Sequence, residues 1–287
     1  MKQGWVIVTG ANGGMGRAIA MAVARAGMPV VMACRDIAKA IPVREDIVRE
    51  SGNSNVELYR LDLASFASIQ MFSEEMTRKD IAVLVNNAGT MPGEFSLTED
   101  GLEMTVGVNY AGTWLLTNSL LPFMGHGIES RVINTTSITT CMGHVGERFL
   151  VPDPERLRRF RAYPDSKLAV LMFTAELARR LRGRTITANA VDPGVVDTGM
   201  ITMGRWYDPL TDLLFRPFIK SPARGASSAI MLATTDRYAH VTGSLFRGGH
   251  PVKLPAEARD LPACRALWEE TLHFVQGKLR RPWDEFS

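Results

Sequence analysis

The sequence has few cysteines, only three in 287 residues, and they stand far apart at Cys34, Cys141 and Cys264. Three widely spaced cysteines exclude a complete disulfide framework and supply no paired-cysteine pattern for a metal ion. We therefore expect no metal centre. A reducing compartment suits such a chain, and the cytosol is the expected cytoplasmic location.

Long apolar runs are also missing. The stretch from Met1 to Gly10 contains an apolar run of only about four or five residues, too short for a signal peptide or a membrane span. No later stretch is apolar enough to cross a bilayer, so we expect no integral membrane segment. A peripheral contact with a membrane surface stays open.

Charge of one sign does not accumulate. Lys and Arg number 33 against 30 for Asp and Glu, and the net charge of +3 comes with no basic block, so we expect no binding to nucleic acid. Apolar residues make up 46% of the chain and charged residues 22%, the balance of a chain that folds throughout. The length suits one large α/β domain over residues 1–287.

What the sequence does have is an alternation of strand and helix patterns. The apolar run Trp5 to Val8 is typical of a strand buried on both faces, and apolar residues then recur at helical spacing from Met15 to Ala26. Further strands are expected at Val30–Cys34, Val56–Leu61, Ile81–Val85, Arg131–Thr135, Thr185–Val191 and Ser244–Phe246. Further helices are expected around Ile47, where Pro42 should kink or delay the helix, and at Ser65–Arg78, Leu102–Leu121, Tyr163–Leu181 and Ala223–Leu232.

This alternation predicts the fold class. Parallel strands joined by helices require right-handed crossovers, which place helices on both faces of the sheet. The predicted fold is α/β, a Rossmann-type doubly wound and mostly parallel sheet of seven strands. A C-terminal tail at about 247–287 follows the last strand.

Two long segments, 141–162 and 199–220, do not fit the alternation, and long connections in a compact domain are often functional. The second is strongly apolar, so it is expected either to be a substrate lid or to pack as a helical hairpin on the core or on another subunit. The first is expected to form another wall of the same pocket.

A glycine-rich turn joins the first strand to the first helix. Free backbone N–H groups and the positive end of the helix dipole meet there, where a pyrophosphate would bind, and glycines allow close approach. A tight strand-to-helix connection could look the same, so the position of the turn is what favours a nucleotide. The residues assigned to cofactor binding here are Gly10, Asn12, Gly13, Gly14, Met15 and Gly16.

Tyr163 and Lys167 are four residues apart, which places both on one face of a helix. A phenol with a pKa of about 10 is a poor base at neutral pH, but a neighbouring ammonium favours the phenolate and should lower that pKa. Ser137, at the end of the fifth predicted strand, would donate a hydrogen bond to a substrate oxygen. Such a pair is by itself more often a surface pair, so the reading depends on the other motifs.

The motifs resemble those of the short-chain dehydrogenase/reductase family. Thr9-Gly10 with Gly14 and Gly16 match T-G-x-x-x-G-x-G rather than G-x-G-x-x-G. The further matches follow in the family's order between about Val6 and Phe246: Asp62, Asn86-Asn87-Ala88-Gly89, Asn109, Ser137, Tyr163 with Lys167, and Pro193-Gly194 with Thr198.

The resemblance implies an oxidoreductase that transfers a hydride between a nicotinamide and a carbonyl or alcohol substrate. Its catalytic residues would be Asn109, Ser137, Tyr163 and Lys167, with Tyr163 exchanging the proton. Lys167 would also bind the nicotinamide ribose, and Asn109 would support a water that passes protons to the lysine. The remaining cofactor-binding residues would be Asp62 and Leu63 beside the adenine, Asn87, Ala88 and Gly89 along the adenosine, and Pro193, Gly194, Val196 and Thr198 at the nicotinamide.

The end of the second strand bears on the choice of cofactor. An NAD enzyme of this architecture would have an acidic residue there, but the chain has Cys34, followed by Arg35, a charged fork suited to the 2′-phosphate of NADP. We therefore expect NADP(H) and hold NAD(H) to be the weaker choice. Against this, Asp36 adjoins the arginine, and Gly13 stands where some NADP-using relatives carry a basic residue.

The motifs and the region around Trp268 are loosely similar to the retinol dehydrogenase and protochlorophyllide reductase branches of the family. That similarity implies an apolar substrate such as a steroid, a retinoid-like molecule, a quinone or a xenobiotic carbonyl. Two alternatives stay open: an NAD(H)-dependent alcohol dehydrogenase, and a non-catalytic protein that senses NADP. Relatives often assemble through the helices at Leu102–Leu121 and Tyr163–Leu181, so we expect a homodimer or homotetramer.

Overall fold

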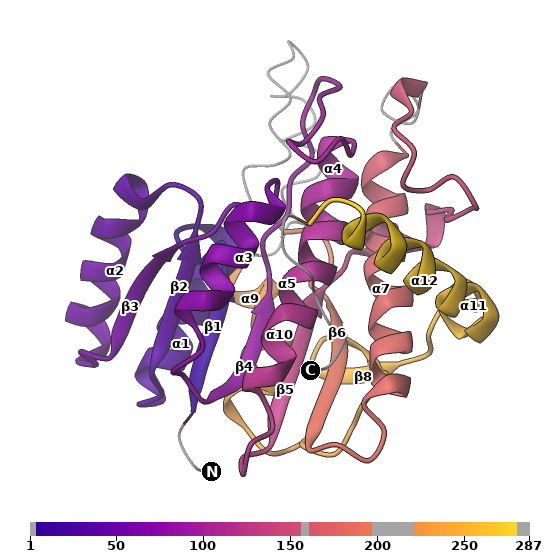
Figure 1. Cartoon of the computed structure of the whole chain (residues 1–287). Coiled ribbons are helices and arrows are strands. Elements are labelled where there is room, and N and C mark those ends of the chain that lie inside the picture. Colours follow the sequence, from indigo (N-terminus) through magenta and orange to yellow (C-terminus); the bar gives the residue numbers. More distant parts are fainter. Residues whose placement is uncertain (1–3, 156–160, 197–220, 280–287) are drawn as a thin grey trace, which may run out of the picture.

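The predicted strands all occur in the computed structural model, which describes residues 4–155, 161–196 and 221–279. These residues form one eight-stranded sheet of order β3-β2-β1-β4-β5-β6-β7-β8 (Figure 1). The pairs from β3 to β7 are parallel, which confirms the doubly wound α/β fold. The strand bounds are β1 Trp5–Thr9, β2 Val30–Cys34, β3 Val56–Arg60, β4 Ile81–Asn86, β5 Ser130–Thr135, β6 Ile186–Asp192, β7 Leu245–Arg247 and β8 His250–Val252.

The eighth strand corrects the predicted number of seven. β8 runs antiparallel to β7 and joins it through a two-residue turn. Gly248 and Gly249 take φ values of +60° and +83° there, the left-handed backbone that a tight hairpin turn requires and that glycine adopts without strain. The adjacent glycines are the sequence signal for this hairpin.

Two apolar layers cover the sheet. Along β1, Val6 and Val8 pack with the helices of one face, while Ile7 packs with those of the other, the alternation expected of a strand buried on both sides. The first face carries α1 Gly14–Arg25, α2 Ile37–Ser51, α9 Pro222–Gly225 and α10 Ser227–Thr234. The second face carries α3 Phe66–Glu75, α5 Gly112–Leu120 and α7 Ala162–Arg180, with the short 3₁₀ segment η3 Ile138–Met142 near the N-terminal end of α7.

The sheet order reverses between β1 and β4, because the chain first builds outward to β3 and then returns to the other side of β1. At such a reversal the connections that leave the carboxyl ends of neighbouring strands diverge and open a crevice. The glycine turn after β1 and the Asn-Asn-Ala-Gly turn after β4 face each other across it.

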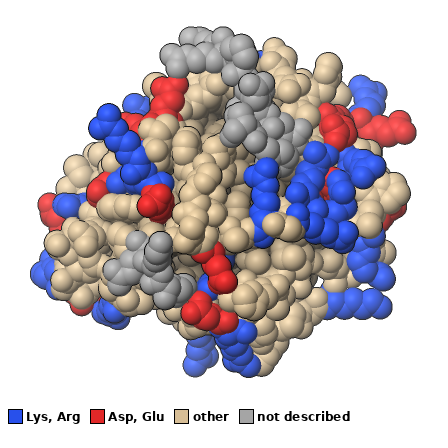
Figure 2. All heavy atoms as spheres, turned by 60° about the horizontal axis from the view of Figure 1, so that its bottom comes forward, with Lys and Arg blue, Asp and Glu red and all other residues tan. Residues whose placement is uncertain are grey.

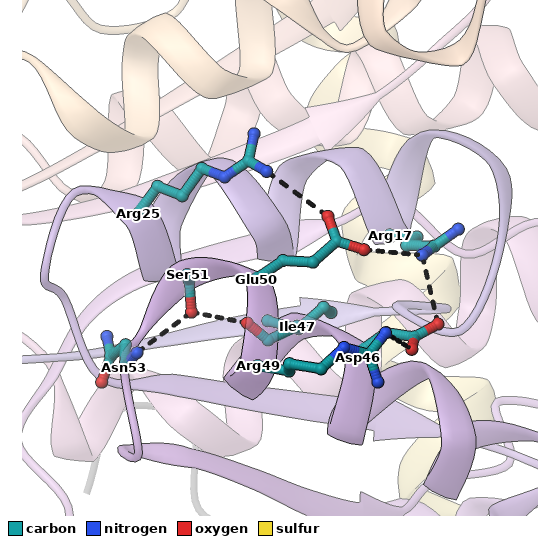
Figure 3. A network of polar contacts seen from close by, with 8 residues as sticks. All are labelled: Arg17, Arg25, Asp46, Ile47, Arg49, Glu50, Ser51 and Asn53. Carbon is teal, nitrogen blue, oxygen red and sulfur yellow. Dashed lines mark hydrogen bonds and ion pairs between the residues drawn. The ribbon is translucent and has the colours of Figure 1, made fainter.

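Helix α2 and its ion pairs are shown in Figure 3. The helix begins at Ile37, ahead of Pro42, so the proline lies inside it and does not delay its start, contrary to one of the two expected outcomes. Arg17 of α1 pairs with Asp46 at 3.4 Å and with Glu50 at 3.8 Å, and Arg25 pairs with Glu50 at 3.4 Å (Figure 3). These contacts tie α1 to α2 along an exposed edge.

The helix expected at Leu102–Leu121 is interrupted. It consists of α4 Met104–Val106, a π-helical turn η1 Gly107–Ala111, α5 and the 3₁₀ turn η2 Leu121–Phe123. A Cβ on Gly112 would lie 2.3 Å from the carbonyl oxygen of Leu63, so the glycine allows α5 to approach the turn after β3 closely. The π-helical turn carries Asn109 at its centre.

The C-terminal tail forms β8 and two helices, α11 Ala256–Arg259 and α12 Leu261–Gln276. Helix α12 lies across α7 and α5 on the outer side of the second face (Figure 1). Trp268 stacks on Phe173 with ring centroids 5.6 Å apart and meets Trp114 edge-on at 5.2 Å. The chain's own tail therefore covers part of the helix surface through which we expected subunits to assemble.

Charged side chains of both signs are distributed over the face in Figure 2, with a group of Lys and Arg toward one side.

Within residues 4–155, 161–196 and 221–279, no helix combines the length and apolar character that a bilayer crossing demands. The expected lid at 199–220 lies outside the described residues.

Candidate active site

The glycine turn after β1 is shaped as the sequence predicts. Gly10 and Gly14 adopt φ values of +65° and +52°. A Cβ on Gly16 would lie 2.1 Å from the carbonyl oxygen of Gly10, a distance that no side chain can occupy. Gly13 caps α1 with nothing within 4 Å of the place a Cβ would take, so the start of the helix is open to a ligand.

A cavity of about 460 Å³ lies beside this turn, at the carboxyl ends of β1 to β4. It brings together eleven of the predicted cofactor-binding residues: Gly10, Asn12, Gly13, Gly14, Met15, Arg35, Asp62, Leu63, Asn87, Ala88 and Gly89. Gly16 does not line the cavity and instead packs under the turn. An open backbone cradle at a helix N-terminus fits the diphosphate of a dinucleotide.

Hydrogen bonds join the end of β1 to the turn after β4, on the two sides of the crevice. The hydroxyl oxygen of Thr9 accepts hydrogen bonds from the backbone N–H groups of Asn87 at 3.0 Å and Ala88 at 2.9 Å. The Asn87 side chain donates to the carbonyl oxygen of Thr9 at 2.9 Å. Its own amide oxygen is buried without a partner among the described residues, which leaves an acceptor at the cavity wall. The two facing turns are therefore fixed relative to each other.

The cation expected at the end of β2 is joined by a second one that sequence reasoning missed. Arg35, Asp36 and Lys39 all line the larger cavity. The Lys39 ammonium lies 3.3 Å from the Asp36 carboxylate, and hydrogen bonds from Lys39 lower the pKa of that carboxyl. Lys39 could have been found from its position, since it lies four residues after Arg35 in the first turn of a helix.

Cys34, the last residue of β2, does not line the larger cavity and contributes no charge to it. Its side chain is buried, and burial raises the pKa of the thiol to about 11. A thiol with that pKa stays neutral at physiological pH. The segment after β2 therefore brings two cations, Arg35 and Lys39, and one carboxylate, Asp36, to the cavity. An acidic residue at position 34 would have added a second negative charge there.

A second cavity, of about 240 Å³, contains the predicted reaction centre. It shares Met15, Asn87 and Gly89 with the first cavity, so the two are contiguous. Six of the predicted site residues line it: Ser137, Tyr163, Lys167, Pro193, Gly194 and Val196. Tyr163 and Lys167 thus lie at the same edge of the sheet as the glycine turn. Thr198, the remaining predicted residue, lies outside the described residues.

Ser137 and Tyr163 meet side chain to side chain. The hydrogen bond between them favours the phenolate, but burial of Tyr163 is the larger effect and raises the pKa of the phenol. The negative charge of Asp192 raises it further. The expected lowering of the Tyr163 pKa is therefore wrong for the protein alone, because taking the phenol out of water disfavours its charged form.

Lys167, one helical turn from Tyr163, is buried as well. The side chain is 3% exposed, and burial lowers the pKa of the ammonium to about 8. Its Nζ donates a hydrogen bond of 3.1 Å to the carbonyl oxygen of Thr135 and lies 5.7 Å from the centre of the Tyr163 ring. With that pKa the amine is still mostly protonated at pH 7.

Asn109 is buried beside the reaction centre but lines neither cavity. Its amide oxygen accepts from the backbone N–H of Thr90 at 2.7 Å, and its amide nitrogen donates to the carbonyl oxygen of Thr90 and the hydroxyl of Ser166, both at 3.0 Å. Ser166 donates in turn to the carbonyl oxygen of Tyr163 at 2.8 Å. The side chain of Asn109 therefore connects the turn after β4 to the first turn of α7.

Several wall residues of the smaller cavity were not predicted. They are Met91, Thr135, Thr136, Ile138, Thr139 and Val195. The Thr135 hydroxyl is buried without a partner among the described residues, while the Thr136 hydroxyl donates to the carbonyl oxygen of Lys167 at 2.9 Å. Their only sequence signal is that they lie close in the chain to the Asn-Asn-Ala-Gly, Ser137 or Pro193-Gly194 motifs. Among the described residues, no group of three metal-binding side chains occurs.

The family described as short chain dehydrogenase matches residues 4–205. Retinol dehydrogenase 13 from Homo sapiens is 38% identical over 278 residues, which cover 94% of this chain and 84% of the relative. Retinol dehydrogenase 11 from Homo sapiens is 36% identical over 275 residues, covering 92% and 83%.

Solved structures agree with these sequence relatives. The structure of an uncharacterised protein from Mycobacterium paratuberculosis is 31% identical with a TM-score of 0.74, and covers 96% of this chain and 94% of its own. An NAD(P) dependent gluconate 5-dehydrogenase from Beutenbergia cavernae, described with bound NADP, is 28% identical with a TM-score of 0.69 and covers 85% and 95%.

Proposed function

The chain belongs to the short-chain dehydrogenase family and is an NAD(P)-dependent oxidoreductase of alcohol or carbonyl groups. We propose that it uses NADP(H) and acts on an apolar substrate. The observation that carries the proposal is the continuity of the two cavities, one lined by the glycine turn and the other by Ser137, Tyr163 and Lys167.

The reaction needs a hydride and a proton, and a bound nicotinamide supplies or accepts the hydride. In reduction Tyr163 would donate its hydroxyl proton to the substrate oxygen, and in oxidation the phenolate would take that proton back. Ser137 would hold the substrate oxygen beside the phenol by a hydrogen bond. Lys167 would hold the nicotinamide ribose with the N–H groups that its bond to Thr135 leaves available.

The preference for NADP(H) is supported by the rim of the larger cavity. Arg35 and Lys39 provide two cations for a 2′-phosphate, and Asp36 is already paired with Lys39. Cys34 stays neutral, so no carboxylate accepts ribose hydroxyls or repels a phosphate at the strand end. The solved relative from Beutenbergia cavernae is described with bound NADP, the same cofactor that we propose for this chain.

The substrate preference is supported by the walls of the smaller cavity. Met15, Met91, Ile138, Val195 and Val196 give it apolar sides around the Ser137 and Tyr163 hydroxyls. Apolar walls with a few convergent polar groups are the usual form of a small-molecule site. A steroid, a retinoid-like alcohol or aldehyde, or a xenobiotic carbonyl fits this chemistry, and relatives named as retinol dehydrogenases favour the retinoid-like class.

Three further proposals follow. We propose one catalytic domain, supported by the single sheet of the described residues. A reducing compartment such as the cytosol is supported by three free cysteines. A homodimer or homotetramer would have to use a surface other than the part of α5 and α7 covered by α12, which light scattering during gel filtration would test. The lid at 199–220 stays a prediction from the sequence.

The test of the function is a titration of both nicotinamide cofactors with a panel of apolar aldehydes and ketones. We expect turnover with NADPH at a KM at least about tenfold below that for NADH, and a smaller difference in Arg35→Ala, which removes one cation from the rim. Tyr163→Phe should abolish turnover. Preference for NADH would support the alcohol dehydrogenase alternative, and tight NADPH binding without turnover would support the sensing alternative.

A further inference from the structure

A buried carboxylate stands at the end of β6, in a place that no predicted motif covers. Asp192 is 1% exposed and directly precedes the Pro193-Gly194 turn. Carboxylates are almost never buried to this degree unless they are paired or hydrogen-bonded, because removing the charge from water is unfavourable. The contacts of Asp192 therefore need an explanation.

Both oxygens of the Asp192 carboxylate have partners. Oδ1 accepts a hydrogen bond of 2.8 Å from the backbone N–H of Gly194. Oδ2 accepts from Nε of Arg247 at 2.9 Å and lies 2.8 Å from its Nη2. Asp192 and Arg247 are paired in the register of β6 and β7, so the sheet itself sets their distance. The carboxylate thus connects the turn after β6 to the neighbouring strand.

This pair lies next to the reaction centre. Pro193 and Gly194 line the smaller cavity together with Tyr163, and Gly194 takes a φ of +75°, a conformation that the bond to Asp192 helps to hold. The Ser137 hydroxyl after β5 and the Asp192 carboxylate from β6 both act on the Tyr163 phenol, and the Lys167 amine of α7 lies 5.7 Å from the centre of its ring. Arg247, from β7, approaches the same carboxylate and is 48% exposed.

We propose that Asp192 and Arg247 are positioning residues of the reaction centre: the pair fixes the Pro193-Gly194 turn and sets how much negative charge faces the Tyr163 hydroxyl. The meaning of the pair for catalysis rests on the proposed function. The geometry of the pair does not, because every contact in it is made between residues of the chain itself.

The two single variants that break this ion pair should have opposite effects on Tyr163. Asp192→Asn removes the negative charge, so the phenolate is less disfavoured and the pKa of Tyr163 falls. Arg247→Met leaves the carboxylate without its cation, so the phenolate is more disfavoured and the pKa of Tyr163 rises. A purely structural pair would give changes in the same direction, because either variant breaks the same contact.

The primary measurement is the titration of tyrosine in the cofactor-free protein, followed by NMR of ¹³C-labelled tyrosine. The chain has five tyrosines, and Tyr163→Phe assigns the signal of interest. We expect shifts of at least about half a pH unit in opposite directions for Asp192→Asn and Arg247→Met, and a midpoint near that of the wild type when both changes are combined. Shifts in the same direction, or no shift in either variant, would overturn the proposal.

A second measurement follows alcohol oxidation against pH with NADP⁺. Oxidation needs the phenolate, so its activity limb should move to lower pH in Asp192→Asn and to higher pH in Arg247→Met. Arg247→Lys keeps the positive charge, so the activity limb should stay at the wild-type pH. The altered contact with Asp192 should weaken NADPH binding through the Pro193-Gly194 turn. An activity limb displaced as far as in Arg247→Met would count against the role of charge. Wild-type protein without turnover would refute the proposed function and leave the NMR result to decide the pair.

Discussion

The two cavities at the carboxyl edge of the sheet are built in different ways. The larger one is shaped by backbone: Gly10, Gly14 and Gly16 let the turn after β1 fold closely over the start of α1. The smaller one is shaped by side chains from η3, α7 and the turn after β6, held in place by burial and by α12 on the outside. The shape of a backbone cradle is determined by a short stretch of sequence, whereas a side-chain pocket depends on contacts between segments that are far apart in the chain.

The difference is sharpest at the two ionisable groups of the smaller cavity, and removing one of them should have the largest effect. Lys167→Met keeps most of the apolar length of the side chain but removes the amine that lies 3.1 Å from the Thr135 carbonyl oxygen. We expect turnover to fall about 10³-fold, within the range for loss of a group that assists proton transfer. Steady-state rates with NADPH and an apolar aldehyde measure it.

Lys79→Met is the matched control for Lys167→Met. Lys79 also lies against aromatic rings and pairs with Glu57 of β3 at 2.8 Å, but it lines neither cavity. Its turnover should stay within about twofold of the wild type. Normal turnover in Lys167→Met would show that the smaller cavity is not the reaction centre.

The outer support of the smaller cavity can be tested separately from its chemistry. Trp268→Ala removes a fully buried indole that stacks between α7 and α5. We expect the free energy of unfolding to fall by about 3–5 kcal/mol, the range for large-to-alanine changes in a core. Urea denaturation measures it, and Leu261→Ala at the exposed start of α12 should cost less than about 0.5 kcal/mol. A loss below about 1 kcal/mol in Trp268→Ala would mean that α12 does not fold cooperatively with the sheet.

The same contrast explains what the sequence could predict. Strand ends such as Val30 and Cys34 and the glycine turn depend on neighbours in the chain, and they were predicted at the right positions. The packing of α12 was not, because it depends on pairs such as Tyr110 and Thr271, whose hydroxyls lie 2.7 Å apart across 161 residues.

The site shows the same limit. The residue types at Ser137, Tyr163 and Lys167 follow from motif spacing, and the structure brings them together in one cavity. The direction of the Tyr163 pKa did not follow, because burial is set by every element that packs around the phenol. Asp192 was missed for a related reason: its partner Arg247 comes from the next strand of the sheet, and no local pattern joins the two.

Burial of Lys167 also predicts a pH dependence of stability. The pKa of its ammonium is about 8 in the folded protein against 10.5 for the free side chain, so the unfolded chain binds more protons between these values. Stability therefore rises with pH in this window, by about 2 kcal/mol between pH 7 and 9.5 from this group. The difference in unfolding free energy between wild type and Lys167→Met, measured at both pH values, isolates the effect. No change in that difference would show that Lys167 titrates normally.

The backbone cradle of the larger cavity should respond to a single methyl group. Gly16→Ala places a Cβ against the carbonyl oxygen of Gly10, so the turn must open. We expect the Kd for NADPH to rise at least about tenfold, which corresponds to about 1.4 kcal/mol. Gly93→Ala is the control, since Gly93 lines neither cavity and nothing lies within 4 Å of its added Cβ. Fluorescence titration of NADPH measures both, and equal affinities would show that the close contact is relieved without cost to binding.

The smallest effect is expected at the ion pairs between α1 and α2, whose residues do not line the larger cavity. Arg17, Arg25, Asp46 and Glu50 keep between 35% and 58% of their side chains exposed, so water and salt screen their attraction. Replacing both Arg17 and Arg25 by Gln in one variant should lower the free energy of unfolding by less than about 1 kcal/mol and leave the Kd for NADPH unchanged. If NADPH binding weakened instead, the position of α2, and with it Arg35 and Lys39, would depend on these surface contacts, and the larger cavity would rest on side chains as much as the smaller one does.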